Sequence, residues 1–162
     1  TYSLTTPLTK RISLAAKPLY EALHATLIEV LRGWRIDAHV AGKTKADAGA
    51  PPFLCFQRHT PEDVLLGEAK VCGSAQRRHR GALLQHGSVI VQTSDYAPEI
   101  AGIHQLSGIP IEPGELAAAW QNALAMRLNL ALESRPLTSV ESRAAREIRD
   151  ARFGSDQWTR RR

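Results

Sequence analysis

Cysteine, methionine, aromatic residues and long apolar runs are all scarce in this chain of 162 residues. Its two cysteines, Cys55 and Cys72, are too few for the disulfide framework that stabilises small secreted domains. No apolar run approaches the roughly 20 residues that a membrane-spanning helix needs, and the first residues lack the pattern of a signal peptide. We therefore expect a cytoplasmic protein that does not cross a membrane.

Patterns that hold metal ions or nucleic acids are also missing from the sequence. The histidines show no spacing typical of a metal site, so we expect no bound metal. The net charge of +5 favours acidic partners, although a solvated basic surface has the same signature. No aromatic-rich or helix-turn-helix motif accompanies this charge. Acidic carrier proteins match the charge equally well, and we expect no nucleic-acid ligand.

The first third of the chain predicts one helix followed by short strands. Leucines and valine recur at helical spacing after Pro18, so residues 18–33 are predicted as a helix. Apolar residues alternate over residues 34–40, which is typical of a half-buried strand. Residues 42–52 are rich in Lys, Ala, Gly and Pro and predict a loop. Residues 53–56 then predict a short apolar strand.

A hairpin lies at the centre of the chain. Gly67 and Glu68 form a two-residue turn signal between the strands predicted over residues 63–66 and 69–72. The longest strand candidate covers residues 83–93. Helix, strands and helices in this order predict a single α+β domain over residues 1–162, with a mixed or antiparallel sheet flanked by helices.

Two further helices are predicted in the last third. Leucines and Trp120 recur at helical spacing over residues 116–128. Thr138 and Glu141 have the spacing of a capping box, which predicts a third helix that runs to about Phe153.

Lys70 is the first candidate for chemistry. It lies between apolar neighbours on a predicted strand, and we expect a turn of small residues, 73–76, directly after it. Glycine and alanine there would let a substrate approach the lysine closely. An ammonium aimed at a carbonyl stabilises the oxyanion of acyl transfer, and such a donor is worth roughly 3 kcal/mol in the transition state. A lone lysine is more often a surface charge, so the surrounding motif carries this interpretation.

Three other positions and one basic cluster are candidates beside Lys70. Cys55 has two interpretations. It is either a small apolar residue that packs at a strand end, or a nucleophile for acyl groups whose thiolate form is favoured by a nearby ammonium. Cys72 is interpreted as packing. His86 is either a satisfied core histidine or a group that shapes a pocket by hydrogen bonding, and we do not expect it to be the main base. The basic cluster of Arg77, Arg78 and Arg80 binds a phosphate or a carrier protein, or forms a solvated turn.

The block Lys-x-x-Gly-Ser-Ala-Gln followed by Gln-His-Gly-Ser resembles the core motif of the lipoate-protein ligase and octanoyltransferase family. Lys70 corresponds to the lysine of the family's active site. Cys55 and Phe56 resemble the Cys-Phe pair of one octanoyltransferase branch, in which the cysteine is the acyl-thioester nucleophile. The remaining matched positions, which the resemblance implies to bind substrate, are Gly73, Ser74, Ala75, Gln76, Arg78, His86, Gly87 and Ser88.

The resemblance implies a fold similar to the catalytic domain of biotin-protein ligases. The family's R-x-x-G-G-x-x-x-x-H segment, which closes over the acyl chain, would precede Thr1 and does not occur in this sequence. We therefore expect the C-terminal portion of the catalytic domain, with a separate N-terminal half as one candidate partner.

Three activities follow from the resemblance. The first is transfer of an octanoyl group from acyl carrier protein through a thioester on Cys55 to a lysine of an acidic lipoyl-acceptor domain, without a cofactor. The second is ATP-dependent ligation of lipoate, in which Lys70 bridges the lipoate carboxyl and the α-phosphate of ATP, with Mg²⁺ screening the phosphate charge. The third is a non-catalytic, carrier-binding half of a two-chain enzyme. The position of Cys55, and a chain end that leaves no room for an accessory domain, favour the transferase.

Overall fold

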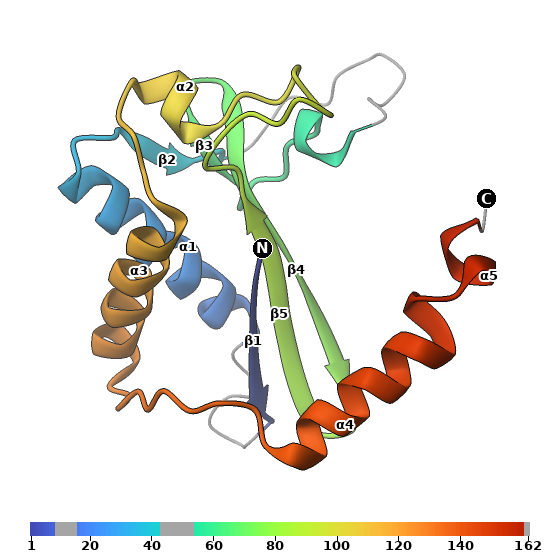
Figure 1. Cartoon of the computed structure of the whole chain (residues 1–162). Coiled ribbons are helices and arrows are strands. Elements are labelled where there is room, and N and C mark those ends of the chain that lie inside the picture. Colours follow the sequence, from blue (N-terminus) through green and yellow to red (C-terminus); the bar gives the residue numbers. More distant parts are fainter. Residues whose placement is uncertain (9–15, 43–53, 161–162) are drawn as a thin grey trace. The chain divides into compact units, whose positions relative to one another are not determined.

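The computed structural model describes residues 1–8, 16–42 and 54–160. The chain divides into two compact units, Thr1–Leu130 and Ala131–Arg162. The first unit contains a five-stranded sheet in the order β1-β5-β4-β3-β2, with every neighbouring pair antiparallel (Figure 1). The strands are β1 (Tyr2–Pro7), β2 (Ala38–Val40), β3 (Val64–Leu66), β4 (Ala69–His79) and β5 (Ala82–Val89).

The helices of the first unit lie on one side of this sheet (Figure 1). They are α1 (Ala16–Gly33), α2 (Ile103–Ser107) and α3 (Pro113–Leu128), and a short 3-10 helix, η1 (Cys55–Gln57), precedes β3. The predicted α+β class with an antiparallel sheet is confirmed, as are the first two helices. Helix α2 was not predicted, because five residues are too few to show a helical period.

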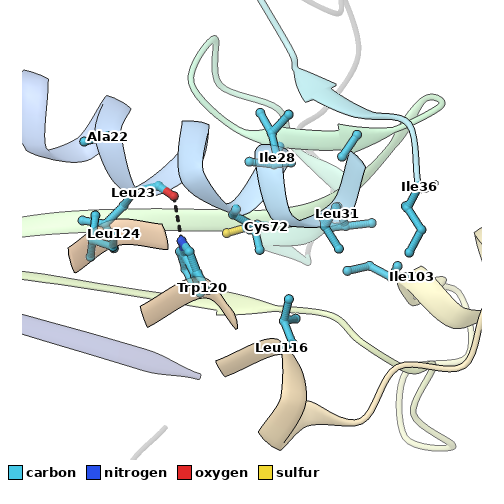
Figure 2. Packing of buried hydrophobic residues seen from close by; sticks show 14 of the residues in the cluster. Ala22, Leu23, Ile28, Leu31, Ile36, Cys72, Ile103, Leu116, Trp120 and Leu124 are labelled. Atoms are coloured by element: carbon cyan, nitrogen blue, oxygen red, sulfur yellow. Dashed lines mark hydrogen bonds between the residues drawn. The ribbon is translucent and has the colours of Figure 1, made fainter. Parts of the chain in front are cut away.

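The core forms where α1 and α3 pack together against β4 and β5 (Figure 2). Leu27 and Leu31 of α1 are completely buried, because leucines at a spacing of four residues share one helix face. From α3, Trp120 enters the same core, and its indole N–H donates to the carbonyl of Leu23 at 2.9 Å. This packing fixes α1 against the sheet, and α1 carries two polar residues that contact the site described below.

The second unit contains α4 (Ser139–Ile148), a π-helical turn (Arg149–Phe153) and α5 (Asp156–Thr159). The predicted capping box is confirmed, since the Thr138 backbone N–H donates to the Glu141 carboxylate at 2.7 Å and Thr138 Oγ1 accepts from the Glu141 backbone N–H. The predicted end near Phe153 is also confirmed. Among the helices described in both units, none is long and apolar enough to cross a bilayer.

The turn predicted over residues 73–76 was wrong. These residues continue β4, and each pairs with a residue of β5. The chain reverses instead at Arg80 and Gly81, which have φ angles of 45° and 77°. Cross-strand pairing overrides the local turn preference of small residues.

Three strand boundaries also differ from the prediction. In the described part of residues 53–56, the 3-10 helix η1 replaces the predicted strand. The Gln57 N–H donates to the Leu54 carbonyl at 3.0 Å and closes the helical turn. The strand at residues 34–40 begins only at Ala38, because Arg35 adopts a φ of 64°. Strand β5 ends at Val89, four residues earlier than predicted. The loop predicted over residues 42–52 lies, apart from Gly42, outside the described residues.

Candidate functional site

A cavity of about 600 Å³ is formed by residues of β1, β4, β5 and η1. Eight of the ten residues that the sequence analysis assigned to a site line it. They are Cys55, Lys70, Gly73, Ser74, Ala75, His86, Gly87 and Ser88. The other described lining residues are Thr1, Tyr2, Ser3 and Phe56.

Strand pairing explains why residues distant in sequence meet at this cavity. Strand β5 lies between β1 and β4, so His86 has Ser3 on one side and Ala75 on the other. Paired residues of neighbouring strands present their side chains on the same face of a sheet. The cavity therefore receives side chains from three strands, while η1 adds Cys55 from one side.

Gln76 and Arg78 are the two assigned residues that do not line the cavity. Both lie further along β4 than Ala75, toward the end of the strand at His79. The Gln76 amide donates to Gln85 Oε1 at 2.9 Å, and Arg78 is exposed toward the end of β4.

Lys70 is held in a fixed position at the cavity. Its ammonium lies 2.8 Å from Asp63 Oδ2, donates to the Arg58 carbonyl at 3.2 Å, and lies 5.3 Å from the centre of the Phe56 ring. The Asp63 side chain is only 2% exposed and that of Lys70 is 10% exposed. A pair this well buried exchanges little with solvent, so the ammonium stays beside the cavity.

Gly73 gives the lysine its space. A Cβ atom at Gly73 would lie 2.5 Å from Lys70 Cε and 2.8 Å from Nζ, which is closer than real Cβ contacts. A residue without a side chain is therefore needed here, although the prediction was that the space would admit a substrate. The approaching group in the structure is the lysine side chain itself, folded back along β4.

Gly87 has a similar role between two other strands. It pairs with Tyr2 of β1 and with Ser74 of β4. A Cβ atom at Gly87 would lie 2.8 Å from both Ser74 Oγ and Tyr2 Cε1. The missing side chain lets the Tyr2 hydroxyl and Ser74 Oγ approach to 2.5 Å across the central strand.

The two cysteines occupy different environments. Cys55 is exposed and lines the cavity, whereas Cys72 is fully buried in the core, as predicted (Figure 2). Burial, the largest of several effects, raises the pKa of Cys72 to about 12. Its thiol is therefore protonated near neutral pH, and Cys55 is the thiol that a ligand in the cavity can reach.

His24 does not line the cavity but contacts the lining residue Ser74, and sequence reasoning missed this role. It comes from α1 and is 2% exposed. Its Nδ1 lies 2.6 Å from the Glu62 carbonyl and its Nε2 lies 2.5 Å from Ser74 Oγ. Four residues earlier on α1, the Tyr20 hydroxyl donates to the Ser74 carbonyl at 2.9 Å. A signal was present, because polar Tyr20 and His24 interrupt the apolar face of a predicted helix.

Burial keeps these groups neutral near neutral pH. It is the main cause that lowers the pKa of His24, against the opposing effects of the Glu62 carbonyl and the Asp63 carboxylate. It likewise raises the pKa of Tyr2 and raises that of Tyr20 to about 12. No described group of three or more His, Cys, Asp or Glu residues is arranged to hold a metal ion.

We expect the free energy of unfolding to fall as pH decreases below about 6.5, the ordinary pKa of histidine. The folded-state pKa of His24 is lowered, so its contribution is complete above that value. It is lost toward the folded pKa, because the unfolded chain binds a proton that the folded chain excludes. Urea unfolding at several pH values measures this slope.

Two variants isolate the contribution of His24. His24→Gln removes the titrating group and should give a smaller loss of stability on acidification than the wild type. The same substitution at His39, on edge strand β2, should keep the wild-type slope. Equal slopes for the wild type and His24→Gln would contradict the expectation.

Sequence comparison agrees with this geometry. The family model described as the lipoyl protein ligase A/B catalytic domain matches residues 1–107. The chain belongs to this family.

Curated relatives of this lipoyl protein ligase family member include octanoyltransferases called LipM. That of Halalkalibacterium halodurans is 24% identical over 165 residues, which cover 86% of this chain and 60% of the relative. That of Bacillus subtilis is 22% identical, with 86% and 59% covered. The chain therefore spans about 60% of the length of these relatives.

Solved structures show the same lipoyl protein ligase fold. A putative lipoate protein ligase from T. acidophilum, solved with bound lipoic acid, superposes with a TM-score of 0.72 at 17% identity. The match covers 96% of this chain and 62% of that one. A biotin protein ligase from Aquifex aeolicus gives a TM-score of 0.55 at 15% identity, covering 78% and 52%. The expected similarity to the biotin-protein ligase catalytic domain is thus confirmed at the level of the fold.

Proposed function

We propose that this chain is an acyltransferase of protein lipoylation that works in the cytoplasm. It would move an octanoyl group from acyl carrier protein to Cys55, and from Cys55 to a lysine of an acidic lipoyl-acceptor domain. One observation supports this proposal most strongly: the exposed thiol of Cys55 and the buried ammonium of Lys70, which is paired with Asp63, line the same cavity. The relatives named octanoyltransferase support it.

The proposed reaction has two acyl transfers. In the first, the Cys55 thiolate attacks the carbonyl carbon of the carrier thioester, a new C–S bond forms, the old C–S bond breaks, and the carrier leaves as a thiolate. In the second, the amine of the acceptor lysine attacks the Cys55 thioester, an amide forms, and the cysteine is regenerated. The Lys70 ammonium would donate to the carbonyl oxygen in both steps, where negative charge develops. Neither step requires ATP or a metal ion.

A second candidate is an ATP-dependent lipoate-protein ligase. A lipoate-protein ligase A solved with bound ATP superposes with a TM-score of 0.68 at 18% identity. In a ligase, Lys70 would contact the lipoate carboxylate and the α-phosphate while an acyl-adenylate forms, and Mg²⁺ would screen the phosphates. Cys55 would then have no role.

Partners follow from the same proposal. One solved relative comes from an archaeal lipoylation system, a bi-partite lipoate protein ligase and its E2 lipoyl domain from Thermoplasma acidophilum. For this chain we propose an acidic lipoyl-acceptor domain and acyl carrier protein as partners, with a separate N-terminal half as a third. If only binding occurs, the chain would be the non-catalytic half of a two-chain enzyme. Its net charge of +5 would then make carrier binding salt-dependent.

Intact-protein mass spectrometry separates these functions. After mixing with octanoyl carrier protein and without ATP, the wild type should gain the mass of one octanoyl group, and Cys55→Ser should gain none. Cys72→Ala is the matched control and should keep the adduct, because Cys72 is buried away from the cavity. Acceptor modification that requires ATP and survives Cys55→Ser would replace the transferase with the ligase. Carrier binding without either product would leave the non-catalytic function.

A further inference from the structure

A directed chain of hydrogen bonds connects the cavity to the buried imidazole of His24. A backbone carbonyl can only accept, so His24 Nδ1 must carry the proton donated to the Glu62 carbonyl at 2.6 Å. In a neutral imidazole the other nitrogen is then an acceptor. His24 Nε2 therefore accepts the hydroxyl proton of Ser74, whose Oγ lies 2.5 Å away.

The donor and acceptor roles in the rest of this hydrogen-bond chain follow from the Glu62 carbonyl. Because the Ser74 hydroxyl proton is given to His24, the Tyr2 hydroxyl donates to Ser74 Oγ at 2.5 Å. Tyr2 in turn accepts from the Gln85 amide at 3.3 Å, and Gln85 accepts from the Gln76 amide. Every donor in this sequence points toward His24, so the order of the protons is fixed by the fold.

Two members of this hydrogen-bond chain, Ser74 and Tyr2, line the cavity that also contains Cys55 and Lys70, and Ser74 is the one bonded directly to His24. Its oxygen has two lone pairs, and the Tyr2 hydroxyl uses one of them. The other faces the Cys72 thiol, a weak donor that the amine of a bound acceptor would replace. A serine hydroxyl bonded to a neutral histidine, which is itself oriented by a third group, is the arrangement that moves protons in nucleophilic catalysis.

We propose that Ser74 and His24 form a proton relay that takes up the proton released when the acceptor amine attacks the acyl thioester. This inference rests on the proposed transferase function and assigns to it a proton acceptor that the motif does not include. Ser74 would touch the attacking nitrogen. His24 would act through Ser74 as a positioning residue and as the group on which the proton resides.

The proton balance of the step is complete. Attack of the neutral amine forms a C–N bond and leaves a proton in excess on nitrogen. That proton passes to Ser74 Oγ while the Ser74 hydroxyl proton passes to His24 Nε2, giving an imidazolium. The C–S bond then breaks, the Cys55 thiolate leaves, and the proton returns through Ser74 to the thiolate. No oxidant, metal ion or nucleotide is consumed.

Burial is the largest influence on the His24 pKa and disfavours a charge on the imidazole, which is why the proton would reside there only transiently. From the segment before β3, the Glu62 carbonyl and the Asp63 and Glu62 carboxylates favour the imidazolium, whereas Lys70 of β4 disfavours it. The other titratable groups around the relay are Tyr20 on the same helix, Cys72 on β4 and Tyr2 on β1. All three are neutral near neutral pH, since burial raises each pKa.

Single-turnover kinetics with His24→Gln test the relay. Glutamine keeps an oxygen that can accept from Ser74 but has no basic nitrogen. The Cys55 adduct should still form with octanoyl carrier protein, while transfer to a primary amine should slow about 100-fold, as expected for loss of general-base assistance. The wild-type transfer rate should also show an acid limb below about pH 6.5, and His24→Gln should lack this limb. Ser74→Ala should slow the same step, and His39→Gln should match the wild type.

The outcomes separate the relay from the transferase itself. If the wild type forms the adduct and His24→Gln transfers it at the wild-type rate with an unchanged pH profile, the relay is overturned and the transferase stands. If the variant also loses adduct formation and melts at a lower temperature, a purely structural role replaces the relay. If the wild type forms no adduct, the transferase fails and the relay fails with it.

Discussion

Replacing Lys70 with methionine is expected to lower the free energy of unfolding by about 3–5 kcal/mol, the cost of breaking a buried ion pair. Methionine has a similar length but no charge, so the Asp63 carboxylate would stay buried with only the Thr60 N–H as a described partner. The same change removes the proposed oxyanion donor, so acyl transfer should fall by at least about 100-fold. Urea unfolding and the octanoyl-adduct assay measure the two effects separately.

Two matched variants separate charge from packing at this position. Lys17→Met removes an exposed lysine paired with Glu21 at 3.6 Å and should cost at most about 1 kcal/mol. Combining Lys70→Met with Asp63→Asn removes both buried charges, so most of the stability should return while transfer stays absent. A loss below about 1 kcal/mol in Lys70→Met would contradict the expectation that this buried ion pair contributes strongly to stability.

Replacing Trp120 with alanine is expected to cost about 3–5 kcal/mol, as for other large-to-small substitutions in protein cores. The indole is 8% exposed, and its N–H donates to the Leu23 carbonyl (Figure 2). It also donates to Thr26 Oγ1 at 3.1 Å. Its ring also meets the Tyr2 ring edge-on, with centroids 4.7 Å apart. The variant should therefore loosen Tyr2 and slow acyl transfer, in addition to lowering the melting temperature.

Trp120→Phe and Met126→Ala are the controls for this prediction. Phenylalanine keeps an aromatic ring against Tyr2, so its cost should be well below that of alanine. Met126 lies on the same helix but is 78% exposed, and its truncation should change stability by no more than about 0.5 kcal/mol. Equal stability of Trp120→Ala and Met126→Ala would contradict the assigned packing.

Elements defined by local signals were predictable from the sequence. The apolar spacing of α1 and α3, the Gly67-Glu68 turn and the Thr138 capping box each depend on residues a few positions apart. The same holds for most of the cavity, because residues 70–75 and 86–88 form two short motifs on paired strands. A short motif places its members together whatever the rest of the fold does.

The relay could not be predicted in this way. Ser74 lies 50 residues from His24 and 72 from Tyr2, and no local period connects them. Their meeting depends on how α1 docks on the sheet and on which strand lies between β1 and β4. The continuation of β4 through residues 73–76 has the same origin, since it is stabilised by pairing with β5. Long-range packing decided these features, and a single sequence does not display it.

The buried pair between Lys70 and Asp63 also bears on the charge of an acceptable substrate. The lysine side chain is already ordered, so its conformational entropy, about 2 kcal/mol for a free lysine, is lost during folding and not during ligand binding. A neutral thioester carbonyl can accept a hydrogen bond from an ammonium that remains paired with Asp63. An anionic carboxylate or phosphate at the same place would share one cation with the Asp63 carboxylate, and the two anions would repel each other. Under the proposed function, this preorganised counterion would therefore favour an uncharged acyl donor.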